Sequence, residues 1–222
     1  MNDLSALDHE SLSSTVYSTL CDALVKGQFK PGDRLKIRDL ASQLGTSVTP
    51  VRDAILRLTH DDAIVFQSAR NIRIPIITKE KYLEIRSIRL RLEALAAETA
   101  ALTATKHDVD TLIRIVALNE EAINSGDRLK GTELNQAFHF QLSTIAQLPV
   151  LQGILRRLWL LMGPLIADAY IDGGRSMIDY HYPVIEAIRS HAPAAAGRAI
   201  MDDIELGGRS MLENLISAAE NA

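Results

Sequence analysis

Apolar residues between positions 35 and 58 recur with the period of two short helices. Leu40, Ala41 and Leu44 follow helical spacing, and Gly45, which tolerates positive φ, comes where the first helix should end. These positions predict a helix, a tight turn and a second helix, which together make a helix-turn-helix.

The second helix of this pair is expected to begin at Ser47, whose hydroxyl can accept an unpaired N–H group at the helix start. Val51, Ile55 and Leu58 recur at intervals of four and three, and so give the helix one buried face. The major groove of DNA admits a helix that presents short polar side chains and arginine near its start. The residues expected at the DNA bases are Ser47, Val48, Thr49 and Arg52.

A β-hairpin is expected directly after the helix pair. Residues 63–66 are β-prone, residues 67–71 are turn-like, and residues 72–75 alternate between apolar and polar. Three helices followed by a basic hairpin form a winged helix-turn-helix, whose wing can contact a phosphate or enter a minor groove. The remaining residues expected at the DNA are Lys36, Arg38, Arg70, Asn71 and Arg73.

From Thr78 onward the pattern is helical throughout. Thr78 is placed to cap a first helix, and Thr105-x-x-Asp108 resembles a capping box at the start of a second. The expected helices cover residues 78–102, 105–126, 132–147, 149–169, 183–190 and 193–220, with a break at Gly173-Gly174. One side of the first helix should carry Tyr82, Ile85, Ile88, Leu92, Leu95 and Ala96. We therefore expect a mainly α protein: a winged helix-turn-helix domain over residues 1–77 and an all-α antiparallel bundle over residues 78–222.

The charge is distributed unevenly between these two domains. The chain has a formal net charge of −4, which by itself argues against a nucleic-acid partner. Residues 23–75, however, carry nine Lys and Arg against five Asp, whereas residues 79–222 carry fifteen basic against nineteen acidic residues. The positive charge is concentrated where the DNA contacts are expected.

No pattern in the chain indicates export or a membrane span. The first ten residues are polar and acidic, and the longest apolar run, residues 158–167, is shorter than the roughly 20 residues that a span requires. Cys21 is the only cysteine, so no disulfide can form within the chain, and we expect it in the core of the first helix. A cytoplasmic protein is expected.

The motifs resemble those of one bacterial family. Residues 26–35, Lys-Gly-Gln-Phe-Lys-Pro-Gly-Asp-Arg-Leu, resemble the connection between the first two helices of GntR-family transcription factors. Arg89-x-x-Leu92-Glu93, Phe138-His139 and the segment from His181 to Ile188 resemble the helical effector domain, the FCD domain, of the FadR-type subfamily. The resemblance covers nearly the whole chain and implies a DNA-binding regulator.

The recognition helix departs from the family pattern. The family usually has Ser-Arg-Thr-Pro-Val-Arg-Glu, whereas this chain has Ser47-Val-Thr-Pro-Val-Arg-Asp53. Val48 can contact a thymine methyl group but cannot make a bidentate contact with guanine. The operator sequence of the family therefore cannot be carried over to this chain.

The resemblance also implies a buried site for a divalent metal. The family's ligand positions fall on Asn135, His139, His181 and Asp203, a set of ligands that can bind Zn²⁺, Ni²⁺ or Mn²⁺. The alternative is a polar cavity in which the two histidines are satisfied by water, Asn135 and Asp203.

Two arginines are candidate effector ligands. The arginine that matches Arg89 faces the ligand cavity in the resembling domain, and Arg86 lies one turn earlier on the same helix. A guanidinium in that place suits a small carboxylate. The alternative for either arginine is an internal salt bridge with Glu93 or Glu120.

The expected function is a transcriptional regulator, a repressor, that a small carboxylate metabolite controls. It should act as a homodimer, because a palindromic operator matches the two-fold symmetry of a protein pair. Two other classes stay open: a hydrolase that uses a metal at His139, His181 and Asp203, and a sensor or interaction protein whose DNA-binding head has degenerated. The sequence shows no HExxH pattern or nucleophile elbow, so we expect no enzyme activity.

Overall fold

The computed structural model describes residues 12–68, 71–170 and 175–220. The chain divides into two compact units. Of the described residues, 12–23 and 32–75 form the first unit, and 24–31 and 76–220 form the second.

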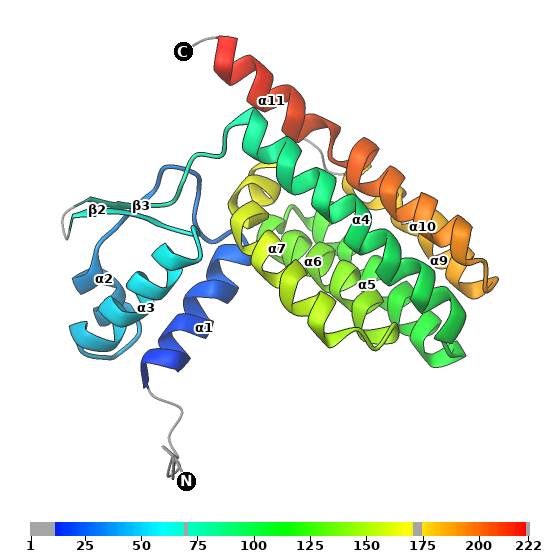
Figure 1. Cartoon of the computed structure of the whole chain (residues 1–222), viewed down its shortest axis with the longest axis horizontal. Coiled ribbons are helices and arrows are strands. Elements are labelled where there is room, and N and C mark those ends of the chain that lie inside the picture. The colour runs from blue at the N-terminus through cyan, green and yellow to red at the C-terminus, as the bar shows by residue number, and fades with distance from the viewer. Residues whose placement is uncertain (1–11, 69–70, 171–174, 221–222) are drawn as a thin grey trace, which may run out of the picture. The chain divides into compact units, whose positions relative to one another are not determined.

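The first unit is a winged helix-turn-helix, as expected. Its elements, shown in Figure 1, are α1 (Leu12–Val25), β1 (Arg34–Leu35), α2 (Ile37–Gln43), α3 (Val48–His60), β2 (Val65–Ser68) and β3 (Asn71–Arg73). The three strands form one antiparallel sheet in the order β1-β3-β2. The hairpin predicted from residues 63–75 is thus confirmed, with β1 added along the free edge of β3.

The turn between α2 and α3 depends on the glycine at position 45. Gly45 has a φ of +61°, a conformation that side chains disfavour. After this turn, Val51, Ile55 and Leu58 are fully buried, as their spacing predicts. The buried face of α3 leaves its opposite side free for a ligand.

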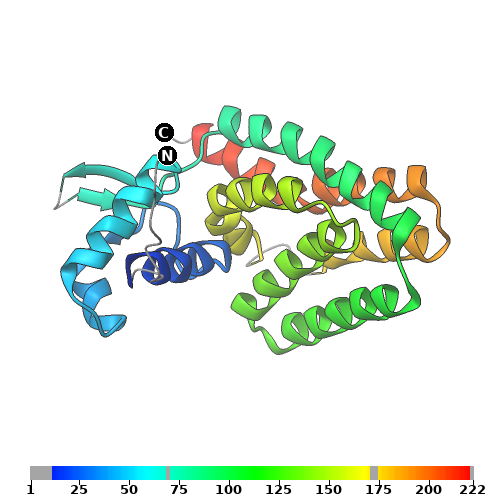
Figure 2. The same ribbon diagram turned by 60° about the horizontal axis from the view of Figure 1, so that its bottom comes forward.

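The second unit is a bundle of helices. Its elements are α4 (Lys79–Thr103), α5 (Lys106–Ser125), α6 (Arg128–Ile145), α7 (Pro149–Ala169), α8 (Ser176–Asp179), α9 (His181–Arg189), α10 (Pro193–Asp202), the π-helical turn η1 (Asp203–Gly207) and α11 (Arg209–Glu220). Figures 1 and 2 both show α4 and α10 side by side along the bundle. The predicted bundle is confirmed.

Helix boundaries follow local capping where the sequence supplies a cap. The hydroxyl of Thr105 accepts the Asp108 N–H and the Asp108 carboxylate accepts the Thr105 N–H, so the predicted capping box is present. The start expected at residue 132 is wrong. Helix α6 begins four residues earlier, at Arg128, because the Asp127 side chain caps it by accepting the Lys130 N–H. The predicted break at Gly173-Gly174 lies outside the described residues.

The last predicted helix, residues 193–220, is interrupted. A π-helical turn separates α10 from α11. At its end, a Cβ on Gly208 would lie 2.7 Å from the carbonyl oxygen of Ile204, so only glycine fits there. Such turns often occur at functional sites, and this one begins at Asp203.

The face that α4 buries differs from the expected one. Thr78 caps the helix, and Tyr82 and Ile85 are buried as predicted, but Ile88 and Leu95 are 39% and 48% exposed. Ala96 is buried as predicted, and the buried side also includes a charged pair and two further small residues, namely Arg89, Glu93, Ala97 and Ala100. Because the charged pair finds its partners inside the bundle, Arg89 and Glu93 face inward while Ile88 and Leu95 face outward.

Among the described helices, α7 is the one long and apolar enough to cross a membrane by length and composition. Leu151, Leu155 and Trp159 on this helix are buried against the rest of the bundle. We interpret α7 as the core helix of the second unit.

Candidate functional site

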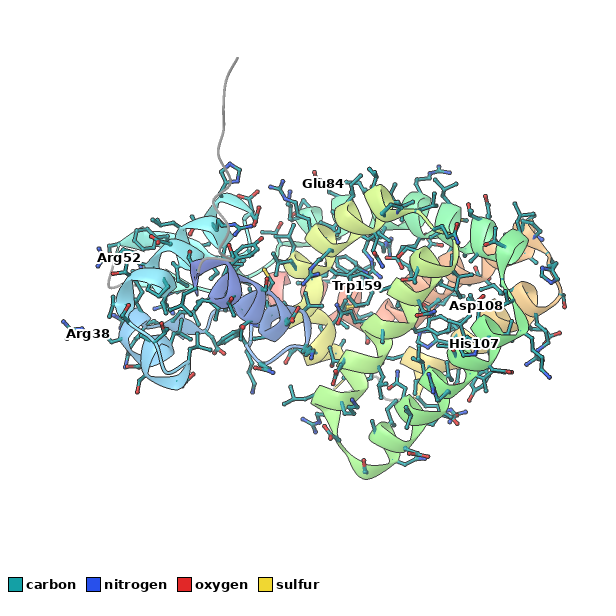
Figure 3. All side chains as sticks on the ribbon, turned by 90° about the horizontal axis from the view of Figure 1, so that it is seen from below. Arg38, Arg52, Glu84, His107, Asp108 and Trp159 are labelled. Carbon is teal, nitrogen blue, oxygen red and sulfur yellow. The ribbon has the colours of Figure 1, made fainter. Side chains whose placement is uncertain are left out.

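The exposed side of α3 carries the residues expected to read DNA. Thr49, Arg52 and Val48 are exposed, the last at 37%. Figure 3 shows Arg52 and Arg38 pointing outward from the first unit. Within the part of the chain that the structure describes, neither arginine forms an ion pair, so both guanidinium groups are available to a ligand.

No side chain caps the start of α3, so its first backbone N–H groups can donate hydrogen bonds to a bound ligand. Ser47 has the extended backbone of an N-cap residue, but its side chain makes no capping hydrogen bond, contrary to expectation. No acidic residue lies in the first turn. A helix start in this state attracts anions, because its N–H groups are unpaired and the helix dipole is positive there.

The other predicted DNA contacts have partners within the first unit. Lys36 lies 3.5 Å from the Asp39 carboxylate. Arg73 donates to the Asn71 side chain and to the carbonyl of Gly32, so it also holds the wing in place. Asn71 begins β3, and Arg70 lies outside the described residues.

A chain of buried charged groups crosses the core of the second unit. Arg89 Nε lies 2.6 Å from one oxygen of Glu93, and the other oxygen lies 2.6 Å from Nδ1 of His139. Trp159 donates its indole N–H to Glu93 as well, and its ring lies 4.4 Å from the Arg89 guanidinium carbon. Figure 3 shows Trp159 inside the bundle. Glu93 thus accepts hydrogen bonds from three neighbours.

These contacts set the protonation states of Glu93 and His139. Burial by itself raises the pKa of Glu93, but the positive charges of Arg89 and His139 outweigh it and lower this pKa to about 2. Burial likewise disfavours the His139 cation, but the charge of Glu93 and the hydrogen bonds that His139 donates to Asp203 and Glu93 raise the pKa of His139 to about 9. The raised pKa favours the protonated form of His139 between the two carboxylates, and a metal ion at this site would have to replace the proton on Nε2.

His181 lies beside these buried charged side chains and makes no hydrogen bond through its ring. Both ring nitrogens are buried and unpaired, although Nε2 is 3.5 Å from an Asp203 oxygen. Burial lowers the pKa of His181 to about 4, so its ring is neutral. The ring stacks on Phe138 at a centroid distance of 3.9 Å.

The residues present fit a divalent cation. One ligand atom each of His139, His181 and Asp203 lies within 4.8 Å of the others, and an unpaired imidazole nitrogen is a natural metal ligand. Glu93 holds Nδ1 of His139, as the carboxylate of a carboxylate–histidine–metal triad does. Asn135, the fourth candidate, lines the same cavity.

That cavity is small. Its volume is about 20 Å³, which is room for a single water or an ion. Arg89, Asn135, His139 and Asp203 contribute its polar lining, and Met177 and Met211 contribute flexible apolar side chains. A larger ligand would have to displace the methionines or the turn at Gly207.

The two arginines proposed for an effector differ in the structure. Arg89 lines the cavity and at the same time forms the internal salt bridge with Glu93 that was its alternative. Arg86 lies outside the cavity lining, with its guanidinium carbon 5.6 Å from the Tyr82 ring centroid. Glu120, the other proposed partner, pairs with Arg175 instead.

Sequence reasoning overlooked the two groups that organise this cluster. Glu93 was considered only as a partner of Arg89, yet it also orients His139, and Trp159 was not singled out. The spacing of four residues between Arg89 and Glu93 indicates their pairing on a helix. Nothing in the sequence indicates that α6 and α7 bring His139 and Trp159 to the same carboxylate.

Comparison with known families supports both units. Residues 12–74 match the family described as bacterial regulatory proteins, gntR family, and residues 84–206 match the FCD domain. The HTH-type transcriptional regulator McbR of Escherichia coli is 34% identical over 158 residues, which cover 71% of this chain and 72% of that protein. A probable D-xylose utilization operon repressor of Paenarthrobacter nicotinovorans is 25% identical over 95% of this chain and 86% of its own length. A regulator of Bacillus subtilis, YdhC, is 32% identical over a shorter stretch, 55% of each chain.

Solved structures show the same fold. The structure of E. coli McbR/YncC has a TM-score of 0.85 at 27% identity and covers 93% of this chain and 99% of its own. A putative GntR regulator of Rhodococcus sp. RHA1 has a TM-score of 0.75 at 21% identity, over 90% of this chain and 97% of its own. The named relatives are transcriptional regulators rather than enzymes, so the alternative of a metal-dependent hydrolase is dropped.

Loss of the central carboxylate should destabilise the bundle strongly. We expect Glu93→Ala to lower the free energy of unfolding by roughly 3 to 5 kcal/mol, because it leaves Arg89 buried without its counter-charge and leaves His139 with Asp203 alone. Urea unfolding followed by circular dichroism measures this change. Glu84→Ala, which removes an exposed partner of Lys81, is the control and should cost within about 0.5 kcal/mol. Equal losses in the two variants would contradict the central role of Glu93.

Proposed function

This chain belongs to the GntR family of bacterial regulatory proteins and carries an FCD domain, and from that premise we propose that it is a repressor controlled by a small carboxylate metabolite. The observation that carries the DNA-binding part is the exposed, unpaired Arg52 on α3 next to an uncapped helix start. GntR-family regulators bind operator DNA, and two copies of α3 would read two half-sites of a palindrome. The protein would act in the cytoplasm as a homodimer.

The cavity in the bundle is the proposed effector site. Its polar lining consists of the Arg89 guanidinium, the Asn135 amide, the His139 ring and the Asp203 carboxylate, of which the guanidinium and the amide can bind an anion with oxygen atoms. Because its present volume admits only an ion or a water, the effector would bind a more open state in which Met177 or Met211 has moved. Such a ligand shifts the population toward the open state and in this way changes the affinity for DNA.

A divalent cation at His139, His181 and Asp203 is part of this proposal. The unpaired nitrogens of His181 and the hydrogen bond from His139 Nδ1 to Glu93 support it. Zn²⁺, Ni²⁺ or Mn²⁺ would supply a positive charge for the carboxylate of the effector. Asn135 would complete the ligand set through its amide oxygen.

The first test concerns sequence-specific binding. Arg52→Ala should weaken binding to the selected operator by about 1 to 3 kcal/mol. Arg52 is exposed and is the one arginine among the residues expected to contact the DNA bases. Fluorescence anisotropy with operator and scrambled duplexes measures both affinities. Arg114→Ala, an exposed arginine on α5, removes the same charge in the second unit and should leave the operator affinity unchanged. A wild-type chain that selects no duplex would instead favour the sensor with a degenerate head.

The second test separates phosphate contacts from base contacts. Arg38→Ala should lower the affinity for operator and scrambled duplexes alike and reduce the slope of log K against log salt by about one unit. A basic side chain that contacts a DNA phosphate displaces a counterion from the DNA, but it makes no contact with a base and so does not distinguish sequences. Binding measured between low and moderate salt gives the slope. An unchanged slope would remove Arg38 from the DNA surface.

The third test concerns the metal. His139→Ala should abolish stoichiometric binding of Zn²⁺, Ni²⁺ or Mn²⁺ and should weaken effector binding with it, because the cation would carry the effector's carboxylate. Elemental analysis of protein prepared without chelator or nickel column measures the first effect, and titration of metal-free and metal-loaded protein measures the second. His107→Ala, an exposed histidine on α5, is the matched control and should retain the metal. Wild-type protein that takes up no metal under supplementation would leave these residues as a polar cavity.

A further inference from the structure

The connecting segment, residues 24–31, comprises the end of α1 and the loop that leads toward β1, and it belongs to the second unit. Gly27 lies so close to α7 that a Cβ at this position would overlap the Cβ of Ala167. The Lys26 ammonium lies 3.3 Å from the Glu133 carboxylate of α6. These two contacts hold the connecting segment against α6 and α7.

A pocket with a volume of about 170 Å³ lies between the connecting segment and the two helices. Besides Gly27, its lining consists of the apolar residues Phe29, Leu129, Pro164 and Ala167 and the charged residues Lys30, Arg128 and Asp168. All of these residues belong to the second unit, and none of them lines the cavity at His139. That cavity holds only an ion or a water, whereas this separate pocket has room for a small metabolite.

Two side chains of opposite charge line this pocket without a partner. Among the residues that the structure describes, the Arg128 guanidinium and the Asp168 carboxylate make no ion pair or hydrogen bond, with each other or with any other group. Lys30 adds a second positive charge to the lining. Because the opposite charges share one pocket but lie too far apart to pair, a ligand that carries both charges can bind between them.

The lining favours one class of ligand. A guanidinium binds a carboxylate with two parallel hydrogen bonds, and the Asp168 carboxylate would accept hydrogen bonds from an ammonium group. The side chains of Phe29, Leu129 and Pro164 offer an apolar surface to the rest of the ligand. A simple acid would leave Asp168 without a donor, and a simple amine would leave Arg128 without an acceptor.

We propose that this pocket is a binding site for an α-amino acid with an apolar side chain. Arg128 and Lys30 bind its carboxylate, Asp168 binds its ammonium group, and the apolar lining covers its side chain. The bound amino acid contacts the connecting segment and α7 together, and so it strengthens the packing between them. This site is independent of the effector cavity and of DNA binding.

Calorimetric titration with alanine, valine, leucine, methionine and phenylalanine tests the site, and the tightest ligand of this panel, taken here as leucine, serves as the probe. Arg128→Ala and Asp168→Ala should each weaken its binding at least about tenfold, because each removes a charge-assisted hydrogen bond. Arg114→Ala and Asp110→Ala remove the same exposed charges from α5, outside the pocket lining, and should bind it like the wild type. Circular dichroism checks that every variant is folded. A wild-type chain that binds none of the panel at millimolar concentration, or an Arg128→Ala variant with unchanged affinity, would overturn the proposal.

Two analogues of leucine test the requirement for both charges. Isocaproate keeps the carboxylate and lacks the ammonium group, whereas isoamylamine keeps the ammonium group and lacks the carboxylate. Both should bind the wild type at least about tenfold more weakly than leucine. In Asp168→Ala the difference between leucine and isocaproate should disappear, because the ammonium group has lost its partner. Equal affinities of the wild type for leucine and isocaproate would overturn the assignment of an amino acid to the pocket.

Hydrogen exchange locates the bound amino acid. Saturating leucine should slow the exchange of amides in the connecting segment and in residues 165–168 of α7, because the ligand bridges the two. Slowing centred on Arg89, His139 and Asp203 would instead place leucine in the effector cavity and overturn the separate site. A chain that selects no operator but shows the expected slowing would overturn the regulator and leave this site intact.

Discussion

The burial of one carboxylate, Glu93, is the constraint on which the second unit depends. A carboxylate inside a helical bundle is tolerated only when its charge is compensated, and Arg89, His139 and Trp159 provide that compensation from three helices. The constraint reaches further along α4. Arg89 and Glu93 face inward together with Tyr82 and Ile85, and Ile88 and Leu95 of the same helix are exposed.

The same buried charged side chains make one side of the cavity polar, since Arg89, His139 and Asp203 line it. His139 is held between Glu93 and Asp203, so its ring cannot rotate freely, whereas His181 contributes two unpaired nitrogens. Under the proposed function, one fixed and one unsatisfied histidine would suit a cation or a polar ligand, and the small cavity beside them would have to open before a metabolite enters. This combination suits a regulator, because a ligand that must open its site is able to shift a conformational equilibrium.

Local sequence rules predicted the parts of the fold that local forces decide. Gly45 in its left-handed turn, the buried face of α3 and the capping box of α5 all depend on residues within a few positions of one another. The family motifs placed Asn135, His139, His181 and Asp203 as candidate ligands. In the structure Asn135, His139 and Asp203 line one cavity, and His181 lies beside His139 and Asp203. Apolar periodicity missed the start of α6, although its cap, Asp127, lies only three residues from the N–H that it accepts, and it missed the π-helical turn before Gly208.

The sequence by itself determined the two-domain fold class, the helix-turn-helix and most helix boundaries, because spacing, caps and turn residues act over short distances. Only the tertiary structure decided which side of α4 is buried, that Glu93 joins Arg89 to His139, and that Ile88 and Leu95 face outward. An amphipathic pattern assumes that apolar residues turn inward. A buried charge with partners on neighbouring helices reverses that choice, and those partners are more than forty residues away in the chain.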